Sequence, residues 1–215
     1  MSPRPRFTRR ARLQAGALLL AGAAIAAGCS GDSGADTAAT TRSGDVQIDI
    51  TAGPVAVEAA GAPATLADGD RDAIIDVVRR YVAAATLAPL RGKRVGDLAP
   101  LFTPAARAGL EGTDRAALVD EGVPEVTGRA RSTSFPVGLT ALSDRAGAID
   151  LVGASFAYEV AARAENGPLT VKRSGELVLT RSPEGWLIDS YRVTVERDGA
   201  GLGPSTTTAT AADGT

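Results

Sequence analysis

The chain has 215 residues, a net charge of −2, one cysteine and no histidine. The missing histidine and the single thiol exclude the usual zinc sites, Cys–His and Ser–His nucleophile pairs, and an intramolecular disulfide. Residues 1–28 carry five arginines and no acid, so their removal changes the net charge from −2 to −7. The remaining chain is acidic and has no basic run to follow a phosphate backbone, which argues against nucleic acid as a partner.

The N-terminus has the layout of a secretory signal peptide: a basic segment, then an apolar one, then small residues. The apolar part, residues 13–28, spans about 24 Å as a helix, which is short of a bilayer core of about 30 Å. Ile25-Ala26-Ala27-Gly28-Cys29 resembles the lipobox of bacterial lipoproteins, although alanine at 26 stands where leucine is usual. The resemblance implies cleavage before Cys29, its lipidation, and a protein anchored outside the cell membrane. An ordinary signal peptide that happens to end near a cysteine is the alternative, and Arg9-Arg10 leaves twin-arginine export open.

Residues 29–66 are predicted to form a flexible tether, because small and polar residues follow Cys29. Within it, residues 45–58 alternate between apolar and polar side chains on both sides of Gly53-Pro54. This pattern predicts a short hairpin, with an ordered arm or a loose tether as the alternatives.

A folded domain is predicted over residues 67–197, and it begins with a helix. Asp70 is the expected N-cap, Pro89 marks the expected end, and the apolar stripe between them is Ile74, Val77, Val78, Tyr81, Val82 and Ala85. Shorter helices are expected over residues 104–110 and from residue 113 or 114 to 119.

Alternating strands follow Pro124. The strongest hairpin signal is Asn166-Gly167, and residues 182–185 form the expected last turn. The final strand changes its apolar phase, which predicts a bulge or bend near Ser190. Residues 198–215 lack an apolar pattern and are predicted to be disordered.

The expected fold is therefore α+β, with a curved antiparallel sheet of about four long strands around one long helix plus two short ones. The segments IIDVVRRYVAAA, ENG and GELVLTRSPEGWLIDSYRV resemble the nuclear transport factor 2-like (ketosteroid isomerase-like or SnoaL-like) superfamily. That resemblance covers about residues 70–197. It implies a cone-shaped domain with an apolar cavity, often dimeric, so a homodimer is an expectation here. Its layout is also similar to that of anchored actinobacterial proteins associated with lipid import.

The resemblance also defines the candidate site residues. An isomerase-type site needs an acid as base and a tyrosine as proton donor, for which Asp150, Tyr81 and Tyr158 are the candidates. The preferred interpretation of Asp150 is instead an exposed acid at the mouth of the strands. The residues expected around a pocket are Tyr81, Phe102, Phe156, Arg173, Trp186 and Tyr191. Arg173 falls in the apolar phase of its strand, so it is either a pocket cation or a long side chain reaching out of the sheet.

The favoured hypothesis is a non-catalytic, lipid-anchored domain outside the cytoplasm. It would bind a small apolar ligand or an envelope protein, and no cofactor or metal is expected. An isomerase or hydratase and a structural spacer or dimerisation module are the alternatives. An open apolar cavity favours ligand binding, a pocket holding Asp150 favours the enzyme, and a filled interior favours the spacer.

Overall fold

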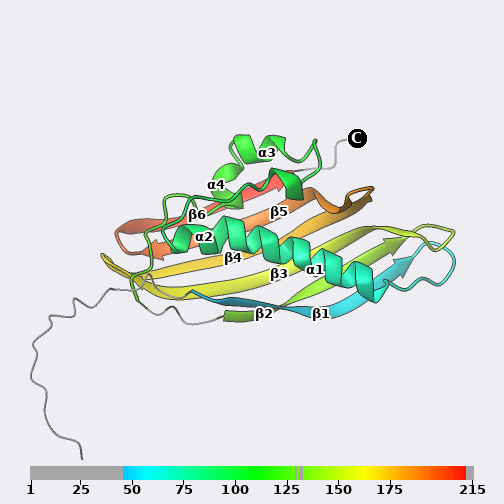
Figure 1. Ribbon diagram of the computed structural model, residues 1–215, viewed down its shortest axis with the longest axis horizontal. Helices are drawn as coiled ribbons and strands as arrows, with labels where there is room; N and C mark the ends of the chain where they lie inside the picture. The colour runs from blue at the N-terminus through cyan, green and yellow to red at the C-terminus, as the bar shows by residue number, and fades with distance from the viewer. Residues whose placement is uncertain (1–45, 129, 131–132, 212–215) are drawn as a thin grey trace, which may run out of the picture. The chain divides into compact units, whose positions relative to one another are not determined.

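The computed structural model describes residues 46–128, 130 and 133–211 (Figure 1). These residues form one sheet with the neighbour order β1-β2-β3-β4-β5-β6. The pairs are antiparallel except β1 with β2, which is parallel. The strands are β1 (Ile48–Ala59), β2 (Thr133–Ser143), β3 (Ile149–Ala164), β4 (Gly167–Ser182), β5 (Gly185–Gly199) and β6 (Leu202–Ala211). The α+β class is confirmed, but the sheet is mixed and has six strands instead of the expected four.

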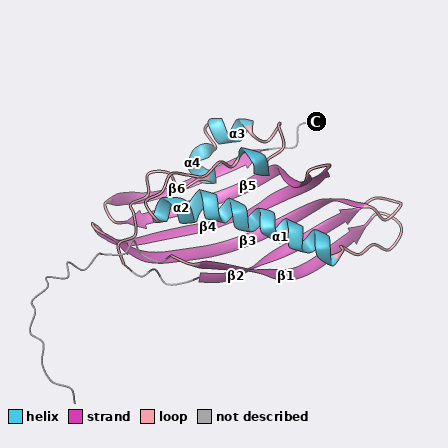
Figure 2. Cartoon of the chain, in the orientation of Figure 1, coloured by secondary structure: helices cyan, strands magenta, loops and turns pink. Residues whose placement is uncertain are grey.

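The helices cover one face of the sheet (Figure 2). α1 (Asp68–Val82) continues through the π-helical segment η1 (Ala83–Leu87) into α2 (Ala88–Leu90). α1 contacts β1 and β5. The 3-10 turn η2 (Ala99–Leu101) and the short helices α3 (Ala108–Glu111) and α4 (Arg115–Leu118) follow, and α4 packs on β5 and β6. None of the helices in the described part of the chain is long and apolar enough to cross a membrane.

The strands turn close to where the sequence predicts, although the β3–β4 turn is made by Glu165-Asn166, one residue before the predicted Asn166-Gly167. A two-residue turn joins Ala164 to its partner Gly167, whose φ of +131° suits glycine. In β5, Ser190 pairs with Val178 while Ile188 pairs with Leu179, so Asp189 is the extra residue of a bulge. The bulge keeps both Ile188 and Tyr191 in the buried layer. The predicted phase change near Ser190 is confirmed.

The expected hairpin at 45–58 is wrong. Residues 48–58 belong to a single strand, β1, in which Ala52 pairs with Val137 and Val55 with Leu139. Gly53-Pro54 is therefore a bulge and not a turn, and one extra residue keeps the apolar positions on both sides of it on the same face. Proline is tolerated here because β1 lies at the sheet edge. Order begins before the predicted boundary at residue 67, since Val46 is already fully buried.

The expected disorder after residue 197 is also wrong for the described part of that segment. β6 pairs with β5 along most of its length, from Tyr191 opposite Ala211 to Gly199 opposite Leu202. β6 buries little besides Ala209, so it lacks the apolar alternation that marks a half-buried strand. Residues 212–215 lie outside the described residues.

Asp70 has a different role from the one predicted. The helix begins at Asp68, and its N-cap Ala67 contributes no side-chain hydrogen bond. Asp70 instead accepts hydrogen bonds from Trp186 Nε1 (3.2 Å) and Arg181 Nη2 (2.6 Å). The acid thus joins the start of α1 to β4 and β5.

Candidate functional site

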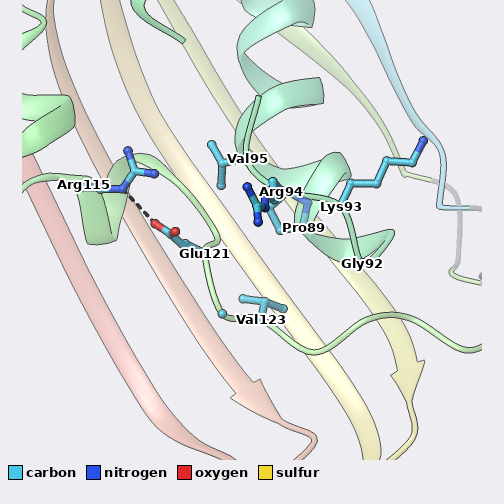
Figure 3. Close-up of a pocket in the computed structure, with 9 residues that line it drawn as sticks. Pro89, Gly92, Lys93, Arg94, Val95, Arg115, Glu121 and Val123 are labelled. Atoms are coloured by element: carbon cyan, nitrogen blue, oxygen red, sulfur yellow. Dashed lines mark hydrogen bonds and ion pairs between the residues drawn. The ribbon is translucent and has the colours of Figure 1, made fainter. Parts of the chain in front are cut away.

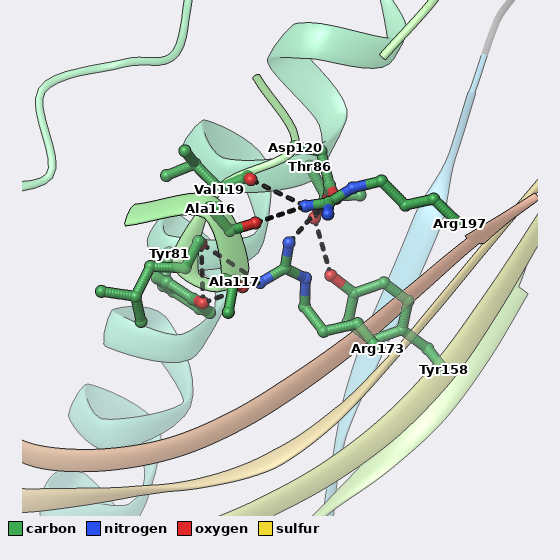
Figure 4. A network of polar contacts seen from close by, with 10 residues as sticks. Tyr81, Thr86, Ala116, Ala117, Val119, Asp120, Tyr158, Arg173 and Arg197 are labelled. Atoms are coloured by element: carbon green, nitrogen blue, oxygen red, sulfur yellow. Dashed lines mark hydrogen bonds and ion pairs between the residues drawn. The ribbon is translucent and has the colours of Figure 1, made fainter. Parts of the chain in front are cut away.

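A buried ion pair lies between the helical layer and the sheet, where the resemblance implied a cavity (Figure 4). Arg173 on β4 contacts Asp120, which follows α4, with 2.8 Å between Nη2 and Oδ2. Both side chains are fully shielded from solvent. Leu169 and Val171 precede Arg173 in the inward phase of β4, so the strand directs the guanidinium into the core.

The carbonyl end of α4 supplies further acceptors for the Arg173 Nη1, whereas the buried Nε has no hydrogen-bond partner among the described residues. Its Nη1 donates to the carbonyls of Ala117 (2.6 Å) and Leu118 (3.1 Å) and to Tyr81 Oη (3.1 Å). Tyr81 donates in turn to the Leu118 carbonyl over 2.9 Å. The last carbonyls of a helix have no partner within the helix, so a buried cation is well placed here.

Asp120 receives hydrogen bonds from three side chains. Besides Arg173, its carboxylate accepts from Thr86 Oγ1 (2.6 Å) and Arg197 Nε (2.9 Å). Arg197 also donates to the carbonyls of Ala116 and Val119. Two guanidinium groups thus share one carboxylate, and carbonyl dipoles balance the remaining positive charge.

The π-helical segment η1 fixes the backbone of Asp120. In an α-helix, residue 89 would donate to the carbonyl of Ala85, but Pro89 has no N–H. Ala85 O instead accepts from the backbone N–H of Asp120 at 2.8 Å. The same segment carries Thr86, whose hydroxyl lies 2.8 Å from Tyr158 Oη. Pro89 therefore leaves the Ala85 carbonyl free for the Asp120 N–H, and Thr86 reaches the Asp120 carboxylate from the same segment.

Neither tyrosine is set up to act as a general base near neutral pH. Burial raises the pKa of both Tyr81 and Tyr158 above the ordinary tyrosine value. Burial acts to lower the pKa of Arg173, but Tyr81 and Asp120 outweigh it and the net shift is upward. The tyrosines stay neutral and the arginine stays charged, whereas a general base needs a pKa close to the working pH.

Aromatic rings fill the rest of this interior. Tyr81 contacts Phe102 and Phe156 edge-on at 6.4 Å between centroids, and Phe102 contacts Tyr191 at 6.1 Å. Tyr158 stacks on Phe135 at 4.9 Å. All of these rings are buried. The residues expected to line a pocket therefore pack against one another.

Trp186 and Tyr191 are anchored by acids at the edge of this core. Trp186 is buried beside Asp70, and the guanidinium of Arg181 lies 4.8 Å from its ring centroid. Tyr191 donates to Asp114 Oδ2 at 3.0 Å. Burial and the Asp114 carboxylate raise the pKa of Tyr191.

Asp150 is not part of the interior. Its side chain is 71% exposed and lies 3.7 Å from Arg181 Nε. Tyr81, Tyr158 and Arg173 lie in one cluster, but its acid is Asp120 and not the expected Asp150. Cys29 lies outside the described residues.

Sequence reasoning missed Asp120, Thr86 and Arg197. A signal was present, because Arg197 continues the inward phase of Val193 and Val195 on β5, as Arg173 does on β4. Two arginines directed into one core require a buried acid, and Asp120 is that acid. Its position in a loop gives it no periodic pattern to detect.

The grooves of the described surface lie mostly outside this interior. One, of about 560 Å³, is lined by residues 92–95, Arg115 and Glu121, with the last two joined by a 2.9 Å ion pair (Figure 3). Another, of about 480 Å³, lies between α1 and Trp186. Among the described residues, no group of three acidic or thiol side chains is arranged to hold a metal ion.

Comparisons with protein-family models, curated proteins and solved structures give no match to this chain.

Proposed function

We propose that this chain is a bacterial lipoprotein that presents a non-catalytic accessory domain outside the cell membrane. Residues 1–28 direct export and Cys29 is lipidated, as the basic, apolar and small-residue layout of the N-terminus supports. Acyl chains then hold the protein on the membrane, since two or more chains anchor stably where one does not.

We also propose that the domain is a nuclear transport factor 2-like variant. One long helix against a long-stranded sheet supports this, as does the bulge at Asp189. The added edge strands β1 and β6 are the departures from the four-stranded pattern.

The observation that carries the functional proposal is the filled interior. Arg173, Asp120 and the packed aromatic rings occupy the space in which a ligand or substrate would bind. Asp150 is exposed, and Asp120, the buried acid near the tyrosines, is already paired with Arg173 and Arg197. A domain with a filled interior acts through its outer surface, and we propose that it acts on an envelope protein. The same filled interior also favours the second candidate, a structural spacer or dimerisation module.

Membrane fractionation of the producing bacterium tests the anchor. Cys29→Ala is expected to release the protein from the membrane fraction or to block its processing, whereas Ser30→Ala, the matched control, stays membrane-bound and processed. Unchanged membrane association and unchanged mass of Cys29→Ala contradict the proposal.

Photo-crosslinking in cells separates the accessory role from the spacer. Glu184 lines the groove between α1 and Trp186, and Glu176 on the opposite face of the sheet is the control position. A photoreactive residue at 184 that crosslinks one defined envelope protein supports the accessory role. Crosslinks only to a second copy, or none at either position, favour the spacer or dimerisation module.

A further inference from the structure

The loop after α2 carries a concentrated positive charge. Arg91-Gly92-Lys93-Arg94 places three cations within four residues, in a chain whose net charge after residue 28 is −7. Lys93 and Arg94 are exposed, and neither forms an ion pair with another described residue. Of the nearby acids, Glu121 is paired with Arg115, and Glu125, whose carboxylate lies against Gly92, has an interaction of its own, so the loop keeps an excess of positive charge. This basic loop, residues 91–94, is therefore free to attract an external anion.

The basic loop is held rigidly against the end of the helix. Lys93 N donates to Ala88 O and Gly92 N to Pro89 O, both at 2.9 Å. Gly92 has a φ of +66°, and a Cβ at this position would lie 2.4 Å from the Glu125 carboxylate. In Figure 3 the Lys93 side chain extends away from the groove. The cations are thus presented on a fixed turn.

The basic loop also adjoins the point where the described chain begins. Arg91 Nη2 donates to the backbone carbonyl of Val46 at 2.5 Å. Only residues 30–45 separate Val46 from Cys29. As the flexible tether that the sequence predicts, a segment of this length would have a root-mean-square end-to-end distance of about 22 Å. A lipid on Cys29 therefore keeps the Val46 end of the domain, and the basic loop with it, close to the bilayer.

We infer that the basic loop docks on anionic lipid headgroups and so orients the anchored domain on its membrane. This inference rests on the proposed lipidation of Cys29. Basic residues near a bilayer are attracted to its negative surface, by a factor of about five in affinity for each cation, and the attraction fades within a Debye length. The acyl chains supply the anchoring, and the basic loop supplies the orientation.

The two lysines of the chain allow a direct test. Lys93 lies in the basic loop, and Lys172 lies on β4 with its side chain 54% exposed. The mature protein, extracted from membranes, is reconstituted into vesicles of phosphatidylcholine alone or of phosphatidylcholine with phosphatidylglycerol. A water-soluble amine-reactive ester then labels the lysines, and mass spectrometry of the digest measures each rate.

Labelling of Lys93 is expected to be at least about threefold slower on the phosphatidylglycerol vesicles. Labelling of Lys172 stays the same, and the difference at Lys93 disappears at about 1 M salt. Arg94→Glu abolishes the protection of Lys93. Arg145→Glu makes the same charge change just after the C-terminal end of β2 and leaves the protection of Lys93 intact. Equal labelling of Lys93 on both vesicles, or equal slowing at both lysines, overturns the inference.

The same digest separates the two proposals. An N-terminal peptide with acylated Cys29 together with unprotected Lys93 refutes only the docking. An N-terminal peptide without acyl chains refutes the anchor, and the docking falls with it.

Discussion

Asp120→Asn tests the buried ion pair most directly. The substitution preserves the shape of the side chain but removes the one carboxylate shared by Arg173 and Arg197. It also turns one acceptor oxygen into a donor that faces a guanidinium or the Thr86 hydroxyl. Asp120 and Arg173 are fully buried, so water cannot replace the lost contacts.

Removing one partner of a buried pair typically costs about 3–5 kcal/mol, out of a total stability of about 5–15 kcal/mol. With a urea slope of about 2 kcal/mol per molar, the unfolding midpoint should fall by about 2 M. Trp186 is the only tryptophan and is buried, so its fluorescence reports the transition. Asp76→Asn, which breaks an exposed pair with Arg80, is the matched control and should cost less than about 1 kcal/mol. A loss below about 1 kcal/mol for Asp120→Asn would mean that the ion pair does not hold the interior.

Four further substitutions, one of them a control, test the strands and the contacts of Asp70. Trp186→Ala should lower the free energy of unfolding by about 3–5 kcal/mol, because it empties a buried site; a loss under about 1 kcal/mol, measured by circular dichroism in urea, would refute the burial. Gly175→Ala places a Cβ 2.3 Å from the Arg192 carbonyl and should cost about 1–3 kcal/mol. Gly203→Ala meets nothing within 4 Å and should change stability by less than about 0.5 kcal/mol; equal effects of the two glycine substitutions would contradict the pairing of β4 with β5. The hydrogen bond from Arg181 holds the pKa of Asp70 below its ordinary 3.8, and the bond from Trp186 adds to this. The carboxylate therefore stabilises the fold above about pH 4, and this contribution is lost as the pH falls further. The stability difference between wild type and Asp70→Asn should shrink between about pH 6 and pH 3, and a constant difference would argue against these contacts.

The elements with strong local patterns were predictable from the sequence. The helical stripe from Ile74 to Tyr81, the turn at Gly167 and the phase change near Ser190 all appear in the structure. Each of these features depends on residues that are close together in the sequence, so the local pattern of side chains is enough to detect it.

The edge strands were not predictable in this way. Gly53-Pro54 is a sequence typical of a turn, and it forms a bulge only because β1 pairs with β2 on both sides of it. β6 is held mainly by backbone hydrogen bonds to β5, which require no apolar side chains. Strand order is a non-local property, and local composition does not encode it.

The candidate site was predictable only in part. Arg173 was correctly identified as an unusual residue in an apolar phase, but its partner Asp120 lies 53 residues earlier, in a loop. Whether an aromatic side chain lines a cavity or fills it depends on packing across the whole domain. The rings of Tyr81, Phe102 and Phe156 fill it.

Native mass spectrometry of the mature protein, purified gently from membranes, tests the central claim most directly. The account predicts the mass of the chain from Cys29 with its acyl chains, and no retained small molecule in the folded domain. A stoichiometric molecule that stays bound to the folded domain and leaves on unfolding would contradict the filled interior on which the proposed function rests.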